Sequence, residues 1–177
     1  PGLFVAAASP IDLDWLDAPA VAVHVIGSVL TSGSEWLRWR WKQQPANAGH
    51  LYVGGLFAFA RHINYFGEIL TFLGWALLTL SPAALLLPLG FATVLRLAYA
   101  PDLDNYIARR YGKDKRFNEW QQLPSLVPGG GGYGSPWTDL LTLSLVGFGV
   151  MALARTFLAV GGGLAVGDGG LAGAGDA

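Results

Sequence analysis

The chain has 177 residues, of which 53% are hydrophobic and only 13% are charged. Soluble globular proteins average about 25% charged residues, so this composition is typical of a membrane protein. The formal net charge of -1 argues against nucleic-acid binding through bulk charge. Because Cys is absent, disulfides, thiolate metal sites and cysteine nucleophiles are excluded.

In chain order, the sequence predicts an all-α integral membrane bundle with about four transmembrane helices plus interfacial helices. A span requires about 20 mostly apolar residues, and the candidates are residues 16–37, 65–80, 82–100 and 137–160. The first candidate is the weakest, because it contains His24 and Glu35. Pro88 should kink the third. Residues 39–60 are amphipathic and are expected at the membrane interface.

The basic residues indicate an orientation for this bundle. If the second and third spans form a hairpin, all but one of the eleven Lys and Arg residues fall on one side, and only Arg155 lies on the other. The positive-inside rule places the basic side in the cytoplasm or its organellar equivalent. The endoplasmic reticulum, an organellar inner membrane and a bacterial inner membrane all fit this pattern.

The densest polar segment lies at the start of the second span. Residues 54–70 read GGLFAFARHINYFGEIL and contain Arg61, His62, Asn64, Tyr65 and Glu68. Asn64 and Glu68 are four residues apart and share one face of a helix. A carboxylate in a membrane segment is costly unless paired, so Glu68 is a functional candidate.

Two other interpretations of this segment are open. Glu68 would have a purely structural role if it paired with Arg96 and so clamped the hairpin. His62 would be a candidate metal ligand, but no second His, Cys or carboxylate lies at ligand spacing, so no metal site is predicted.

The second polar segment follows the third span. Its periodicity predicts a short amphipathic helix from Pro101 to about Tyr111, with Gly112 as the C-cap. The predicted topology puts this helix beside Arg61. Guanidinium, amide and phenol groups would then surround a carboxylate, which suits a phosphate-bearing or zwitterionic cofactor.

At these segments the chain resembles a known group of membrane enzymes. RWRWKQQPANAGHLYVGGLFAFARHINYFGE, together with the later Arg-Tyr-Gly and Leu-Val-Pro, is similar to the C-terminal domain of the steroid 5-alpha-reductase-like proteins. Sterol C14 and C24 reductases and isoprenylcysteine carboxyl methyltransferases are related to that group. The resemblance covers residues 33–128, with Ile63 in place of the usual Pro.

The resemblance implies a domain organisation. Residues 1–32 would be an N-terminal segment with the first span, and 33–128 the reductase-like domain. Residues 129–160 would be a Gly-rich linker with an added span, and 161–177 a disordered low-complexity tail.

The resemblance also implies NADPH-dependent reduction of a lipid or sterol enone. Nine residues would then bind the cofactor, while the catalytic residues stay unassigned: Arg61, His62, Asn64, Tyr65, Glu68, Arg96, Tyr106, Arg109 and Arg110.

Two alternatives remain open at the level of sequence. One is a non-catalytic accessory subunit of a larger membrane complex, which would contact lipids and other subunits through the first and fourth spans. This alternative has support because little sequence precedes the first span to supply the substrate-binding groups of the reductases. The other is an S-adenosylmethionine-dependent methyltransferase of lipids or isoprenoids.

Overall fold

The computed structural model describes residues 17–79 and 81–128, together with the isolated helical residues 144, 145, 149, 152 and 156. All regular structure in these residues is helical, so the prediction of an all-α fold is confirmed for this part of the chain. The α-helices are α2 (Ala18–Lys42), α3 (Ile63–Leu78), α4 (Leu86–Val94), α5 (Ala100–Tyr111) and α6 (Phe117–Gln122). Short segments complete the set: 3-10 helices η2 (Pro45–Asn47), η3 (Gly55–Ala58) and η4 (Pro82–Leu85), and the π-helix η5 (Leu95–Tyr99).

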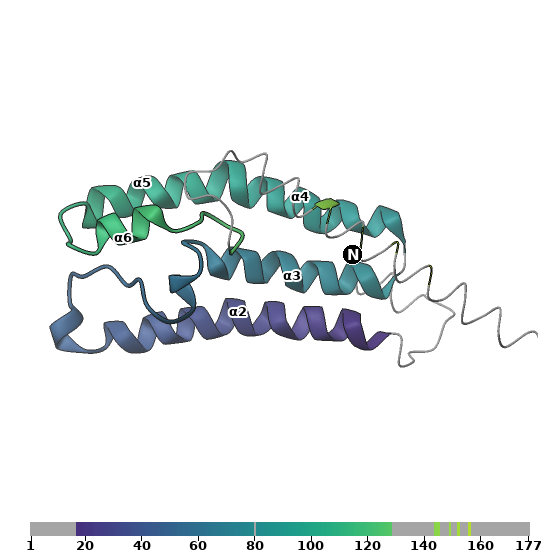
Figure 1. Ribbon diagram of the computed structural model, residues 1–177, viewed down its shortest axis with the longest axis horizontal. Coiled ribbons are helices and arrows are strands. Elements are labelled where there is room, and N and C mark those ends of the chain that lie inside the picture. Colours follow the sequence, from purple (N-terminus) through teal and green to yellow (C-terminus); the bar gives the residue numbers. More distant parts are fainter. Residues whose placement is uncertain are drawn as a thin grey trace, which may run out of the picture.

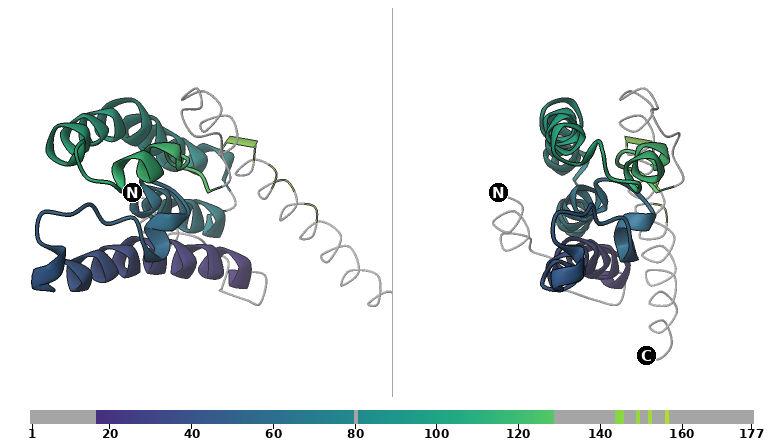
Figure 2. Two further views of the ribbon diagram at one scale, coloured as in Figure 1. Left: turned by 60° about the vertical axis from the view of Figure 1, so that its left-hand side comes forward. Right: turned by 90° about the vertical axis from the view of Figure 1, so that its left-hand side faces the viewer.

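Three long helical rods lie side by side (Figures 1 and 2). The helix α3 is in the middle, with α2 on one side and the continuous run of α4, η5 and α5 on the other. Chain direction reverses at each connection. The short α6 packs against the α5 end of this row, and the loop between α2 and α3 lies at the same end. This end of the molecule therefore gathers the polar segments that the sequence singled out.

Glycine allows α2 and α3 to approach closely. A Cβ atom added at Gly27 would lie 2.5 Å from the backbone nitrogen of Thr71, and one at Gly67 would lie 2.6 Å from that of Thr31. The hydroxyl of Thr31 donates to the carbonyl of Asn64 at 3.1 Å. Small residues at a helix crossing favour backbone-to-backbone packing, which is common between membrane helices. The close contact fixes the position of the Asn64 turn against α2.

The third rod is longer than predicted. The expected helix at 101–111 is present and ends at Gly112, whose N–H donates to the carbonyl of Ala108 at 3.0 Å. The span predicted at 82–100 and this helix form one continuous run, because the π-helix η5 joins α4 to α5. A π-helical turn shifts the hydrogen-bonding pattern just before Pro101, which has no N–H to donate. The chain therefore continues through the proline as one helix.

Residues 39–60, which were expected at the membrane interface, have little regular structure beyond the end of α2. Residues 39–42 form the end of α2, and the rest of this segment is a loop with the two short 3-10 helices η2 and η3. Gly55 has a φ of 57°, and a Cβ there would lie 2.7 Å from the Tyr52 hydroxyl. A left-handed backbone and a crowded neighbour both require glycine at this turn.

One helix in the described part of the chain is long and apolar enough to cross a membrane: Pro82–Tyr111, with 30 residues. The helix α3 is apolar but shorter. Membrane association is therefore supported by the length and composition of a single helix, and the four-span arrangement stays a prediction. The predicted fourth span, apart from the isolated residues named above, and the tail at 161–177 lie outside the described residues.

Candidate functional site

Arg61 and His62 begin the segment RHINYFGE, residues 61–68, which is called the signature below. This Arg-His pair is held by the segment that follows α6. The backbone N–H of Arg61 donates to the carbonyl of Pro124 at 2.9 Å, and that of His62 donates to the carbonyl of Ser125 at 3.0 Å. Both side chains are buried. They lie just before the first residue of α3, so the signature begins at a helix N-terminus rather than along a helix face.

Asp104 of α5 binds both members of this pair. Its Oδ2 accepts from Nη1 of Arg61 at 2.9 Å, and its Oδ1 accepts from Nε2 of His62 at 2.8 Å. The Arg61 guanidinium also lies over the Trp120 ring, 5.1 Å from its centroid. A single carboxylate thus links the start of α3 to α5. Sequence analysis missed Asp104, although its place on the helix expected beside Arg61 was an available signal.

A cavity of about 190 Å³ opens between these elements. Its lining comes from the end of α2, the loop before α3, the start of α3, α5 and α6. The residues are Arg38, Lys42, Leu51, Tyr52, Phe57, Arg61, Asn64, Leu103, Tyr106, Ile107, Arg110, Tyr111 and Trp120. Four of these side chains are cations, and none of them is a carboxylate. The cavity therefore has the chemistry of an anion site.

Two of the cations are neutralised by carboxylates that are not themselves part of the cavity lining. Arg61 is paired with Asp104, as described above, and Arg38 forms an ion pair with Glu35 one turn earlier on α2. The other oxygen of Glu35, Oε1, accepts from Nδ2 of Asn64 at 3.0 Å. This contact holds the Asn64 amide with its donor turned to α2. Glu35 therefore orients one cation and one amide of the lining.

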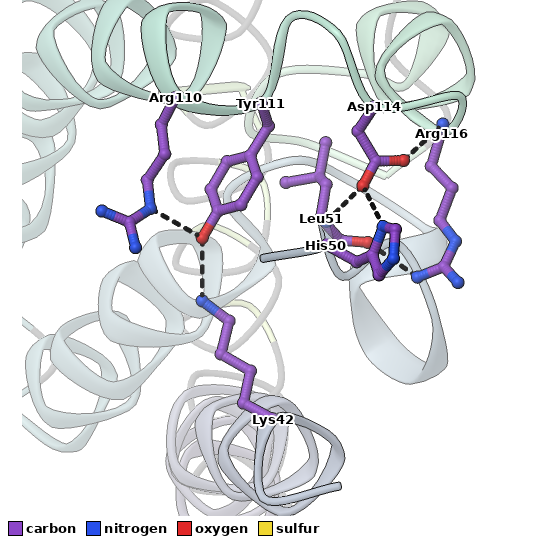
Figure 3. Close-up of polar contacts among 7 residues, drawn as sticks. All are labelled: Lys42, His50, Leu51, Arg110, Tyr111, Asp114 and Arg116. Atoms are coloured by element: carbon purple, nitrogen blue, oxygen red, sulfur yellow. Dashed lines mark hydrogen bonds and ion pairs between the residues drawn. The ribbon is translucent and has the colours of Figure 1, made fainter. Parts of the chain in front are cut away.

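Tyr111 connects the other two cations across the cavity (Figure 3). Its hydroxyl oxygen accepts from Nζ of Lys42 at 3.4 Å and from Nε of Arg110 at 3.2 Å. Lys42 ends α2 and Arg110 lies in the last turn of α5, so this contact joins the first and third rods. Tyr52, also in the lining, stays a neutral phenol near neutral pH, because burial raises its pKa.

A second carboxylate fixes the loop beside the cavity (Figure 3). Asp114 Oδ2 accepts from Nδ1 of His50 at 3.0 Å and from the N–H of Leu51 at 2.9 Å, and Oδ1 accepts from the N–H of Arg116 at 2.9 Å. Burial alone would raise the pKa of Asp114, but these donors outweigh it and lower that pKa to about 2. These hydrogen bonds to Asp114 hold Leu51 in the lining of the cavity.

The structure brings together four of the nine residues that the sequence nominated: Arg61, Asn64, Tyr106 and Arg110 line the cavity. The remaining five lie outside the lining: His62, Tyr65, Glu68, Arg96 and Arg109.

Three of these five have clear surroundings. The rings of His62 and Tyr65 are stacked with centroids 5.3 Å apart, and Arg109 is exposed on α5. Glu68 lies one turn beyond Asn64 on α3. The proposed clamp between Glu68 and Arg96 is not among the ion pairs of the described residues.

Sequence analysis missed several lining residues, above all Arg38 and Lys42. Their side chains come from the end of α2, whose sequence predicts a membrane span and whose basic residues indicate its orientation. The available signal was the RWRWK run at the end of that helix.

A comparison with protein families gives one match. Residues 2–123 match the family described as "Protein of unknown function (DUF1295)". The chain belongs to the DUF1295 family. The DUF1295 match includes every residue of the cavity lining, and it starts well before the boundary at residue 33 that the resemblance suggested. No curated protein and no solved structure matches the chain.

Proposed function

We propose that this DUF1295 protein is a steroid 5-alpha-reductase-like integral membrane protein that binds NADPH and reduces a lipid or sterol enone. The observation that carries the proposal is the cavity lined by four cations and no carboxylate, formed directly around the Arg-His-x-Asn-Tyr segment. Phosphate groups are recognised by arginine and lysine in this way. When bound, the dinucleotide would supply a hydride to the electron-poor carbon of the double bond, and a proton from solvent would complete the reduction.

The dimensions of the cavity limit which part of the cofactor it holds. Small-molecule sites commonly occupy about 300 to 1,000 Å³, and this cavity has about 190 Å³. It therefore suits the phosphates, with the rest of the dinucleotide extending beyond it. Arg61 and Arg110 would bind phosphate oxygens, and Tyr106 and Asn64 would supply further hydrogen bonds. No residue is proposed as the catalytic acid.

The membrane arrangement is part of the proposal. The rods α2, α3 and α4 to α5, with the predicted span at 137–160, would cross the bilayer, and the cavity would open on the side rich in basic residues. The apolar Pro82–Tyr111 helix supports this. Further support comes from apolar side chains of α2 that are about half exposed and suited to lipid contact: Val21, Val25, Ile26 and Val29.

The test is equilibrium binding of NADPH to the full chain purified in detergent, followed by NADPH oxidation with a panel of sterol enones. Saturable binding is expected, and Asn64→Leu should weaken it. Glu68→Gln should weaken it as well if the nicotinamide end extends along α3 from Asn64 toward that carboxylate. Absence of saturable NADPH binding would contradict the proposal.

A non-catalytic accessory subunit is the second candidate, and one observation favours it. The first two residues of the Arg-His-x-Asn-Tyr segment, Arg61 and His62, are buried and bound to Asp104, so a structural role can account for them without a bound cofactor. This candidate predicts co-purification in a large membrane complex without binding of either cofactor. Native mass measurement of the protein extracted in mild detergent distinguishes the two candidates.

The methyltransferase alternative has weaker support from the cavity. S-adenosylmethionine carries a sulfonium cation, and a lining with no carboxylate and with the cations Lys42 and Arg110 outside any ion pair of the described residues is a poor environment for it. Binding of S-adenosylmethionine in the same assay, without NADPH binding, would favour this alternative.

A further inference from the structure

Two of the four cations at the cavity have no carboxylate partner within the part of the chain that the structure describes. Arg38 and Arg61 each pair with an acidic side chain. Within residues 17–79 and 81–128, none of the ion pairs involves Lys42 or Arg110. Both side chains are exposed, so this part of the cavity presents to solvent two positive charges that no carboxylate of the described residues pairs with.

Both unbalanced charges converge on one atom (Figure 3). Lys42 Nζ and Arg110 Nε donate to the same hydroxyl oxygen of Tyr111, at 3.4 Å and 3.2 Å. The two cations thus lie within two hydrogen-bond lengths of each other, where like charges repel. A neutral phenol compensates this repulsion only in part. An anion seated against both cations would remove it.

We propose that Lys42, Arg110 and Tyr111 form a subsite for a phosphate monoester. A phosphate monoester carries a charge of about -1.5 to -2 at pH 7 and presents three terminal oxygens. Its charge matches the two cations. Its oxygens can accept from the ammonium, from the guanidinium and from the Tyr111 hydroxyl, which is free to rotate its proton outward. A carboxylate or a phosphate diester brings only one charge.

The tertiary structure holds the Tyr111 hydroxyl in place, and the exposed side chains of Lys42 and Arg110 both reach it. The ring of Tyr111 is buried in a cluster with Leu51 and Trp120, so its hydroxyl has a fixed position between α2 and α5. Both cations contact that ring as well, with Lys42 Nζ 5.7 Å and the Arg110 guanidinium carbon 5.6 Å from its centroid. Preorganised donors lose less conformational freedom when a ligand binds.

Two sources can supply this group. One rests on the proposed function: NADPH carries a 2′-phosphate monoester that NADH lacks, so Lys42 and Arg110 would determine the preference for NADPH. The other is a lipid with a monoester headgroup, such as phosphatidic acid. The chemistry recognised is the same in both cases.

The experiment measures dissociation constants of NADPH and NADH for the full chain in detergent. The variants are Lys42→Gln and Arg110→Gln, with Lys113→Gln as the matched control, because Lys113 is exposed and outside the lining. Each of the first two should lose about tenfold or more in NADPH affinity. Lys42→Gln should leave NADH affinity unchanged, which also shows that this variant is folded. Arg110→Gln should lose more NADPH affinity than NADH affinity, because the proposed function also places Arg110 against the phosphates that both nucleotides share. The control should resemble the wild type for both.

The outcomes separate this subsite from the proposed function. If NADPH binds and both variants keep wild-type affinity, or lose NADPH and NADH affinity equally, the monoester subsite is overturned while the proposed function stands. If neither nucleotide binds, the proposed function fails, and short-chain dihexanoyl phosphatidic acid is the next probe. Binding of that lipid over dihexanoyl phosphatidylcholine, lost in Lys42→Gln, would support the subsite with a lipid source. Equal binding of the two lipids would overturn it.

Discussion

At the scale of single residues, Asp104 is the side chain that holds Arg61 and His62 in position. It neutralises the buried Arg61 and fixes the ring of His62 through separate oxygens. Without it, a buried guanidinium would lose its carboxylate partner. Removing one partner of a buried ion pair is usually far more costly than the net value of the pair, because the remaining charge stays desolvated.

We therefore predict that Asp104→Asn lowers the free energy of unfolding by about 3 kcal/mol. The matched control is Asp102→Asn, since Asp102 is an exposed carboxylate on the same helix. The control should change stability by less than about 0.5 kcal/mol. Thermal unfolding of both variants in one detergent measures the difference. Equal shifts for the two variants would show that Asp104 holds nothing in place.

The lowered pKa of Asp114 predicts how the stability of the protein depends on pH. Its pKa falls from 3.8 to about 2 on folding, so the folded state binds this proton less readily than the unfolded state. Its contribution of about 2 kcal/mol is therefore complete above pH 4 and is lost as the pH falls from about 4 to 2. The stability of the wild type relative to Asp114→Asn should shrink through that window. Melting curves of both proteins between pH 2 and pH 6 measure this, and a constant difference would contradict the assignment.

At the scale of elements, the crossing of α2 and α3 determines where the site forms. Gly27 and Gly67 each face the backbone of the opposite helix. Their contact brings the end of α2, with Glu35 and Arg38, against the start of α3. Any larger side chain at these positions would separate the helices and displace the Asn64 amide from Glu35.

We predict that Gly27→Ala destabilises the protein by about 1 to 3 kcal/mol through overpacking. Gly33→Ala on the same helix is the control, because a Cβ there would make only ordinary contacts at 3.8 Å with Leu56 and 3.9 Å with Val29. The control should be neutral or more stable, since alanine favours helix. Thermal unfolding of both variants tests the crossing, and a stable Gly27→Ala would show that the helices can separate without cost.

At the scale of the whole molecule, the absence of Cys makes membrane orientation directly measurable. Lys113 lies beyond the cavity end of the third rod, and Ala83 lies near its opposite end. If this rod spans a bilayer, Lys113→Cys and Ala83→Cys should be exposed on opposite sides. An impermeant maleimide applied to sealed vesicles should label only one of them, and permeabilisation should expose the other. Labelling of both in sealed vesicles would contradict a membrane-spanning rod.

Much of the secondary structure followed from the sequence alone. Runs of apolar residues predicted helices where α2, α3 and α4 occur, and the three- and four-residue spacing before Gly112 predicted α5. These features are local, because hydrophobic periodicity and capping residues act within one or two turns. The sequence also marked Arg61, Asn64, Tyr106 and Arg110 as site residues, since polar groups stand out in an apolar chain.

What the sequence could not determine is which side chains meet across the rods. Asp104 binds residues more than forty positions earlier, and Lys42 meets Tyr111 from the other end of the domain. These pairings depend on the close crossing of α2 with α3 and on the π-helix that carries α4 into α5 without a break. Both are consequences of packing and backbone hydrogen bonding between distant segments. The tertiary structure alone therefore decided that cations line the cavity, and that the carboxylates paired with two of them, Glu35 and Asp104, stay outside the lining.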